Sequence, residues 1–222
     1  MRKLFYLMCS LLTVAFVSCE NSKGPSDPAN GHEYVDLGLS VKWATCNVGA
    51  NSPEEYGNYY AWGETETKAE YSIETYKWSK GKYDTYTKYC ILPTEGTVDN
   101  KITLELSDDV ANANWGGNWR MPNSVELEEL LDKCTWRWDE KNGVEGYKVI
   151  SNTNGNSIFL PAAGLCYDSI LESAGFIAFY WSRSLDSGYS NDAYSLYFNS
   201  DDVSCSVYDS RYCGLSVRPV LP

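Results

Sequence analysis

Residues 180–213 concentrate side chains that recognise ligands rather than transform them. Of these 34 residues, 22 are Tyr, Ser, Asp or Asn, and none is Lys, Glu or Gln. Tyrosine offers a large, stiff, amphipathic contact area at low entropy cost, while Ser and Asn adapt their hydrogen bonds. Asp and Asn beside Tyr would also suit a sugar. The composition indicates a binding surface, although solvent-facing strands and loops carry the same residues.

Alternation within this stretch predicts which side chains are accessible. Apolar residues at Leu196 and Phe198, and again at Val203, Cys205 and Val207, mark one buried face. The residues between them face the other way, with Tyr194 ambiguous. The candidate ligand-binding residues are Tyr180, Tyr189, Tyr194, Tyr197, Ser204, Ser206, Tyr208, Asp209, Ser210 and Tyr212.

Catalytic chemistry has few residues to work with. The one histidine, His32, lies outside the predicted sheet, and the sequence holds no HExxH, GxSxG, P-loop or Gly-rich dinucleotide turn. The adjacent pairs Asp108-Asp109 and Asp201-Asp202 are more typical of solvated turns than of a glycosidase dyad. Calcium is the one metal they leave open. We expect a non-enzymatic protein without a cofactor.

The eight cysteines lie partly in the N-terminal segment and partly in the rest of the chain. Cys9 and Cys19 lie in the N-terminal segment, and six more follow, without a CxxC motif that would suggest zinc or redox chemistry. Disulfide pairing cannot be read from their spacing. We expect Cys46 and Cys134 to be buried, whereas Cys205 and Cys213 lie in a polar region and require another explanation.

The N-terminus predicts export. Two positive charges precede an apolar stretch at residues 4–17, which is shorter than the roughly 20 residues that span a bilayer and is typical of a signal peptide. It ends in Phe16-Val17-Ser18-Cys19, which resembles the lipobox of bacterial lipoproteins, where the cysteine is acylated and becomes the new N-terminus. The alternative is ordinary secretory cleavage beside a bystander cysteine.

This cleavage defines the expected organisation. Residues 1–18 form the signal peptide, residues 19–31 a flexible polar tether with a lipid on Cys19, and residues 32–222 a single folded domain. We expect an outer-membrane lipoprotein of the cell envelope, for which exposure at the surface is one of two open alternatives. Residues 20–22 are too weak a sorting signal to decide whether the domain faces the periplasm or the exterior.

The charge excludes some partners. The net charge is −12 and becomes −14 when the two positive charges of residues 1–18 are removed. Nucleic-acid affinity comes from Lys and Arg on phosphates, so we expect no nucleic-acid partner. Apart from the lipid, an anionic membrane surface would not attract this chain.

Local signals predict an α+β domain of short antiparallel strands and hairpins with one or two helices. The clearest helix covers residues 124–133, with Asn123 and Glu126 forming a capping box and apolar side chains at Val125, Leu127, Leu130 and Leu131. Asn-Gly at 142–143 and 154–155 predicts hairpin turns. Strands are expected at 34–39, 41–48, 58–62, 135–138, 146–150, 157–160, 179–184, 193–199, 203–208 and 215–220. A helical turn is expected at 53–56, and a loop at 64–100.

Several motifs resemble one family. They are YVDLGL at 34–39, WATCNVGA at 43–50, YYAWGET at 59–65, WRMPN at 119–123, EELLDKCTW at 128–136, IFLPAAG at 158–164, YWS at 180–182 and SVRPV at 216–220. They resemble the Fibrobacter succinogenes major paralogous domain family, over nearly all of the chain after the tether. Most of these residues are glycines in turns and packed aromatic anchors, and we interpret them as scaffold.

The resemblance implies a C-type-lectin-like fold, similar to the variable proteins of diversity-generating retroelements, whose C-terminal segment forms a ligand-binding face. In those systems Asn codons ending in a pyrimidine are randomised at adenines and yield Tyr, Ser, Asp or Cys, but never Lys, Glu, Gln, Met or Trp. Residues 204–206 and 208–213 fit that set, including Cys205 and Cys213, while Trp181 falls outside it and is framework.

The implied function is recognition of a protein or carbohydrate ligand on another cell, a phage or a host surface. Two alternatives stay open. One is a structural or adhesin-like surface component. The other follows from a distant similarity to formylglycine-generating enzymes, which use a close pair of C-terminal cysteines; Cys205 and Cys213 are the candidates.

Overall fold

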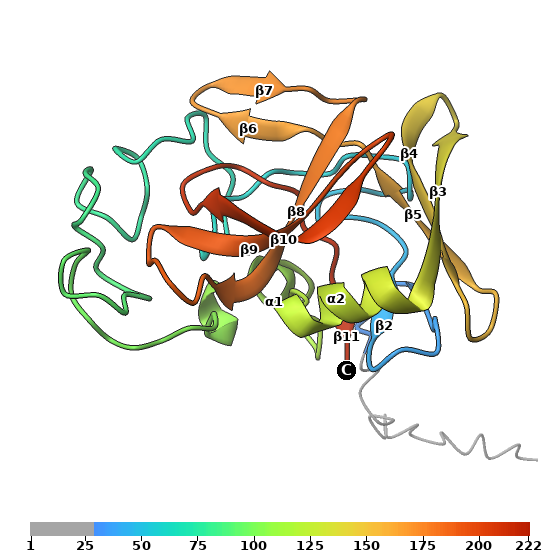
Figure 1. Cartoon of the computed structure of the whole chain (residues 1–222), viewed down its shortest axis with the longest axis horizontal. Coiled ribbons are helices and arrows are strands. Elements are labelled where there is room, and N and C mark those ends of the chain that lie inside the picture. Colours follow the sequence, from blue (N-terminus) through green and yellow to red (C-terminus); the bar gives the residue numbers. More distant parts are fainter. Residues whose placement is uncertain (1–28) are drawn as a thin grey trace, which may run out of the picture.

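Hairpins build most of the structure, a computed structural model that describes residues 29–222. The expected signal peptide, Cys19 and most of the tether lie outside the described residues. Within them, the chain is α+β, with two helices and small antiparallel sheets (Figure 1). The helices are α1 (Val110–Trp115) and α2 (Ser124–Lys133), with a short 3-10 turn at Leu106–Asp108.

Four sheets are seen in this part of the chain. The first joins the two ends of the domain, with β2 (Lys42–Ala44) between β1 (Tyr34–Val35) and β11 (Val220–Leu221). The second is the hairpin sheet β3 (Cys134–Lys141), β4 (Val144–Ser151) and β5 (Ser157–Pro161). The third is β8 (Ile177–Leu185), β9 (Asp192–Asn199) and β10 (Val203–Ser210), and the fourth is the small hairpin of β6 (Leu165–Tyr167) and β7 (Ile170–Glu172).

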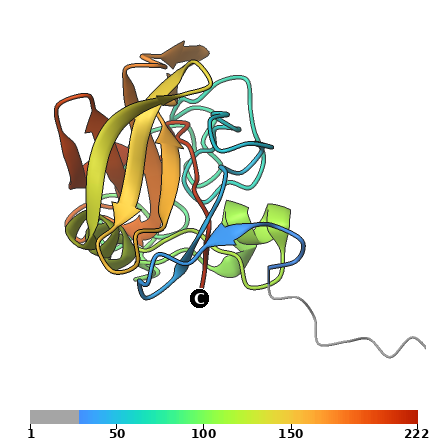
Figure 2. The same cartoon turned by 90° about the vertical axis from the view of Figure 1, so that its right-hand side faces the viewer.

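The two ends of the described chain lie with β11 at one end of the domain, and the β6–β7 hairpin lies at the opposite end in both views (Figures 1 and 2). The domain starts earlier than residue 32, because Ala29 is buried and its carbonyl accepts a hydrogen bond from Trp119 Nε1 at 2.7 Å. His32 stacks on Trp115 with ring centroids 3.9 Å apart, so it serves the N-terminal packing.

Helix α2 confirms the capping prediction. Asn123 accepts from the Glu126 amide while the Glu126 side chain accepts from the Asn123 amide, which satisfies two otherwise unpaired donors. Leu127 and Leu130 are buried against the β8–β10 sheet. The prediction was wrong for Val125, which is 67% exposed because it lies on the solvent side of the first turn.

The predicted hairpin turns are present. Asn142 and Gly143 have φ of 50° and 82°, the left-handed pair that a two-residue turn between β3 and β4 requires. Residues 64–100 form no helix or named strand, as expected. Residues 53–56 form a turn rather than a helix, and residues 58–62 and 215–220 form mainly isolated bridges rather than full strands. The hairpin β6–β7 and helix α1 were not predicted.

The β8–β10 sheet is packed on both faces, which corrects the expectation of one buried face. Leu196 and Phe198 join the cluster under α2, whereas Trp181 and Ala193 join a second cluster formed largely by residues 44–121. The two faces alternate along the strands as their pleat requires. Tryptophans at 43, 62, 119 and 181 are all buried, as the scaffold interpretation of the motifs predicts.

Two arginines are fully buried and bind backbone carbonyls instead of carboxylates. Arg211 donates to the carbonyls of Lys88, Tyr89 and Ser190 and to the Tyr76 hydroxyl, at 2.6–3.1 Å. Arg218 donates to the carbonyls of residues 44, 45 and 159 and to Asn47 Oδ1. Aromatic rings of residues 62, 76, 86 and 89 surround the Arg211 guanidinium within 6 Å. The irregular segment 64–100 is therefore fixed to the C-terminal strand region.

We predict that Arg211→Met lowers the free energy of unfolding by about 3 kcal/mol or more, because each buried carbonyl left without a donor costs about 1–3 kcal/mol. Urea denaturation measures this. The control is Arg137→Met, whose side chain is 60% exposed, with an expected change within about 0.5 kcal/mol. Equal effects of the two variants would contradict the role given to Arg211.

Candidate functional site

The candidate residues lie on both faces of the β9–β10 pair. Tyr197 is opposite Ser204 on one face, and Tyr194 is opposite Tyr208 on the other. The pairing register shifts between residues 204 and 207, and Ser206 within this bulge is exposed. The Tyr194 and Tyr208 rings are 4.8 Å apart. Tyr189 is 60% exposed in the loop before β9. The predicted residues therefore do not form one continuous face.

Tyr180 is removed from the candidate surface. Its side chain is 1% exposed, and its hydroxyl donates to the Pro161 carbonyl at 2.8 Å and lies 3.4 Å from Asn47 Nδ2. Strand β8 lies between β9 and the bridged segment at Ser216, so its inward side chains are enclosed. Composition cannot separate such a core tyrosine from an exposed one.

Tyr212 occupies a different position from the other candidates. It lies just after β10, is 6% exposed, and lines a cavity of about 270 Å³. Its hydroxyl lies 3.1 Å from that of Tyr83, and its ring centroid lies 6.2 Å from that of Tyr167. Tyr83 and Tyr167 are 54% and 42% exposed, so three tyrosines border a hollow that solvent reaches.

The remaining walls come from segments that sequence reasoning did not select. Ser72, Ile73, Glu74 and Tyr83 belong to the irregular segment 64–100. Tyr167 is the last residue of β6, and Asp168 follows it in the β6–β7 turn. Tyr71 and Asp168 join these segments through two backbone hydrogen bonds of 2.7 and 3.1 Å. The absence of periodicity in 64–100 was the one available signal, since long ordered segments without helix or strand are usually functional.

Asp209 is a half-buried carboxylate on β10, three residues before Tyr212. It accepts a hydrogen bond from the Ser195 hydroxyl. Burial raises the pKa of Asp209 from 3.8 to about 6, an increase that the Ser195 hydrogen bond reduces and the nearby Asp192 carboxylate reinforces. Ser210 donates to Asp192 at 3.2 Å, so Asp209 and Ser210 are partly engaged in holding β10 to β9.

The six described cysteines are free thiols. Cys134, Cys205 and Cys213 are buried, whereas Cys46 is only partly buried, contrary to expectation. Cys205 and Cys213 belong to different apolar clusters, so packing explains both cysteines. Burial raises the pKa of the Cys213 thiol to about 12, which leaves little nucleophilic thiolate at neutral pH.

The carboxylate pairs take two different roles. Asp109 is fully buried, caps α1 and accepts from the Met121 amide at 3.0 Å, so it is a structural residue and not a solvated turn. Asp108 is likewise buried, on Lys88 and Tyr89. Asp201 and Asp202 are exposed in the β9–β10 turn, as expected. Within residues 29–222 no group of three His, Cys, Asp or Glu side chains is arranged to hold a metal ion.

No protein-family model matches this chain, and neither a curated protein nor a solved structure does so. In the part of the chain that the structure describes, no helix is long and apolar enough to cross a bilayer.

We predict that Asp209→Asn stabilises the domain at pH 8 but not at pH 4. The folded protein favours the protonated form, so wild-type stability is retained below pH 4 and falls as the pH rises through about 6. The gain at pH 8 should be about 1–3 kcal/mol. Urea denaturation at both pH values measures it. Asp201→Asn, in the exposed turn, should show no such dependence, and a pH-independent gain at 209 would contradict the assignment.

Proposed function

We propose that this protein is a lipid-anchored, extracytoplasmic, non-enzymatic binding protein whose ligand is a protein or a carbohydrate. The observation that carries the proposal is the hollow bordered by Tyr83, Tyr167 and Tyr212. Stiff aromatic walls with Ser72, Glu74 and Asp168 at the edge combine apolar area with hydrogen-bonding groups. A sugar ring on an aromatic face or a loop of a protein ligand could use both.

The position of the hollow supports a role away from the membrane. The described chain begins at the end opposite the β6–β7 turn that carries Tyr167 and Asp168 (Figures 1 and 2). A lipid on Cys19 would hold the first end near the bilayer and leave the tyrosines facing outward. The test is the variant Cys19→Ser. Palmitate labelling that persists in this variant, or its retention in the membrane fraction, would refute the lipid anchor on Cys19.

The proposal includes a C-type-lectin-like fold. Helix α2 packed on the β8–β10 sheet and the hairpin sheet beside it are consistent with a C-type-lectin-like fold. If residues 204–213 form a diversified face, the DNA flanking the gene should hold an imperfect copy of the codons for about residues 160–220, differing where that copy has adenine. A flanking region without such a copy and without a reverse transcriptase would remove diversification but leave the tyrosine hollow.

A structural or adhesin-like surface component is the second candidate, and one observation favours it. The β6–β7 region exposes Ile170, Leu171 and Phe176, with Phe176 75% exposed. Ile170 and Leu171 lie in β7 and Phe176 just before β8, and exposed apolar side chains of this kind are typical of protein contact surfaces. A soluble monomer that binds a dissociable ligand would argue against this candidate. The formylglycine-type oxidase is disfavoured, because Cys205 and Cys213 lie in separate clusters.

We predict that Tyr83→Ala and Tyr167→Ala each weaken binding at least tenfold, because truncating an aromatic contact residue typically costs about 1–2 kcal/mol or more. Binding is measured on a glycan array and on intact cells. The control is Tyr34→Ala, a tyrosine of β1 that is 42% exposed. Unchanged binding in both hollow variants, with the fold intact, would place the ligand elsewhere.

A further inference from the structure

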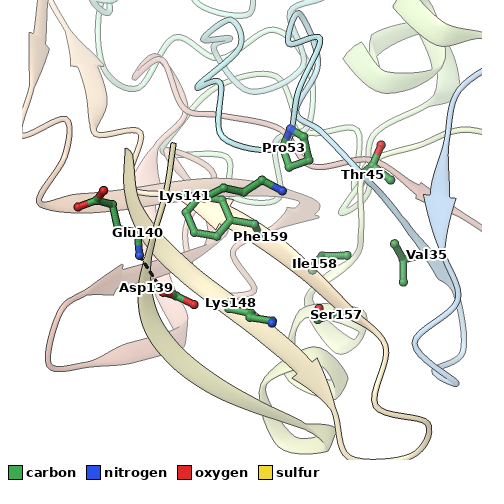
Figure 3. A pocket seen from close by; sticks show the side chains of 10 residues that line it. All are labelled: Val35, Thr45, Pro53, Asp139, Glu140, Lys141, Lys148, Ser157, Ile158 and Phe159. Atoms are coloured by element: carbon green, nitrogen blue, oxygen red, sulfur yellow. Dashed lines mark hydrogen bonds between the residues drawn. The ribbon is translucent and has the colours of Figure 1, made fainter. Parts of the chain in front are cut away.

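A second cavity lies far from the tyrosine hollow, on the outer face of the β3–β4–β5 sheet. It has a volume of about 330 Å³ and is closed on its other side by β1 and by the segment 45–53 (Figure 3). Asn142 Nδ2 in the β3–β4 turn donates to Glu54 Oε1, which ties this segment to the sheet. The cavity shares no lining residue with the tyrosine hollow.

The floor of this cavity includes the apolar side chains of Ile158 and Phe159, among lining residues that are mostly polar or charged. Phe159 of β5 is buried, and its ring lies against Gly146 of β4, where an added Cβ would come within 2.9 Å of Phe159 Cζ. Val35 and Pro53 stand on the opposite side (Figure 3). An apolar group in the cavity would therefore contact apolar side chains from more than one segment.

Two lysine ammonium groups border this floor. Lys141, the last residue of β3, extends past the Phe159 ring toward Pro53, while Lys148 lies on β4 beside Asp139 (Figure 3). Within residues 29–222, neither lysine makes a hydrogen bond or an ion pair with a carboxylate. In contrast, lysines 68, 77, 88, 101 and 133 all do so.

The nearby carboxylates bond to other groups, although within residues 29–222 the Oε2 atom of Glu54 is buried without a hydrogen-bond partner. Asp139 accepts from Arg137 Nη2 at 2.7 Å and from the Glu140 amide at 3.1 Å. Glu54 accepts from Asn142. Glu140 is exposed at the rim. In a chain of net charge −12, this cavity therefore presents two half-buried cations that act on Glu54 and Asp139 from a distance but bond directly to neither carboxylate.

From this geometry we infer that the cavity is a second binding site, for a small carboxylate with a flat apolar body. The body would lie on Phe159 between Val35 and Pro53, and the carboxylate would accept from Lys141 and Lys148. A charge-assisted contact in a partly enclosed site is stronger than on open surface, because water screens it less. The volume, at the small end of the range for ligand pockets, is sufficient for one ring with its acid group.

The test uses phenylacetate and its neutral analogue phenylacetamide, which have the same ring and nearly the same shape. Binding to the full mature chain in an uncharged detergent is followed by the amide shifts of Phe159 and Lys148. Phenylacetate should bind at least tenfold more tightly than phenylacetamide. The double variant Lys141→Gln/Lys148→Gln should lose that tenfold preference and keep its phenylacetamide affinity within twofold.

The control is Lys101→Gln/Lys133→Gln, which removes the same charge from two surface lysines that pair with Glu105 and Glu129. It should leave the preference unchanged. Equal affinity for the two probes, equal losses in the two double variants, or no shift at Phe159 with either probe would each overturn the inference. These outcomes are independent of the tyrosine hollow, whose variants leave this cavity intact.

Discussion

The fold depends on two guanidinium groups that bind backbone carbonyls in the interior. A domain with so many irregular segments leaves carbonyls that no helix or sheet pairs, and each must find a donor. Arg211 and Arg218 supply a charged fork that satisfies several of them at once, drawn from parts of the chain far apart in sequence. No carboxylate is needed, because backbone dipoles and aromatic faces surround the charge. These two residues take the place that a longer sheet or a disulfide would take in another domain.

This constraint explains where sequence reasoning succeeded. Helix α2 and the β3–β4 hairpin are specified locally, by a capping box and by an Asn-Gly pair, so neighbouring residues contain the information. The segment 64–100 is specified by Tyr76 and Tyr89 meeting Arg211, at separations of more than 120 residues. No window of the sequence contains both partners. The strand at residues 34–35 is shorter than predicted, because the carbonyls of Asp36 and Leu37 accept from the side chains of Asn154 and Ser151 and not from a neighbouring strand.

The residue types of the candidate site could be predicted from the sequence, but the position of the site on the fold could not. Composition identified the C-terminal stretch as rich in recognition side chains, and Tyr212 does border a hollow. Composition could not show that Tyr180 is enclosed, because the strand on its far side is the bridged segment at Ser216. Nor could it select Tyr83 and Asp168, whose neighbours are set by the docking of the β6–β7 turn on Tyr71.

The packing also limits which C-terminal residues are free to vary. Cys205, Cys213 and Tyr212 are buried, and Ser195 is wholly enclosed where it bonds Asp209, so replacing them disturbs the sheet as well as any surface. Tyr189, Ser206 and Tyr208 are exposed on the loop before β9 and along β10. A binding face that changes its sequence would have to change at such positions while Arg211, next to Tyr212, stays fixed. The same strand region therefore joins the buried Arg211 to a surface whose side chains the fold does not specify.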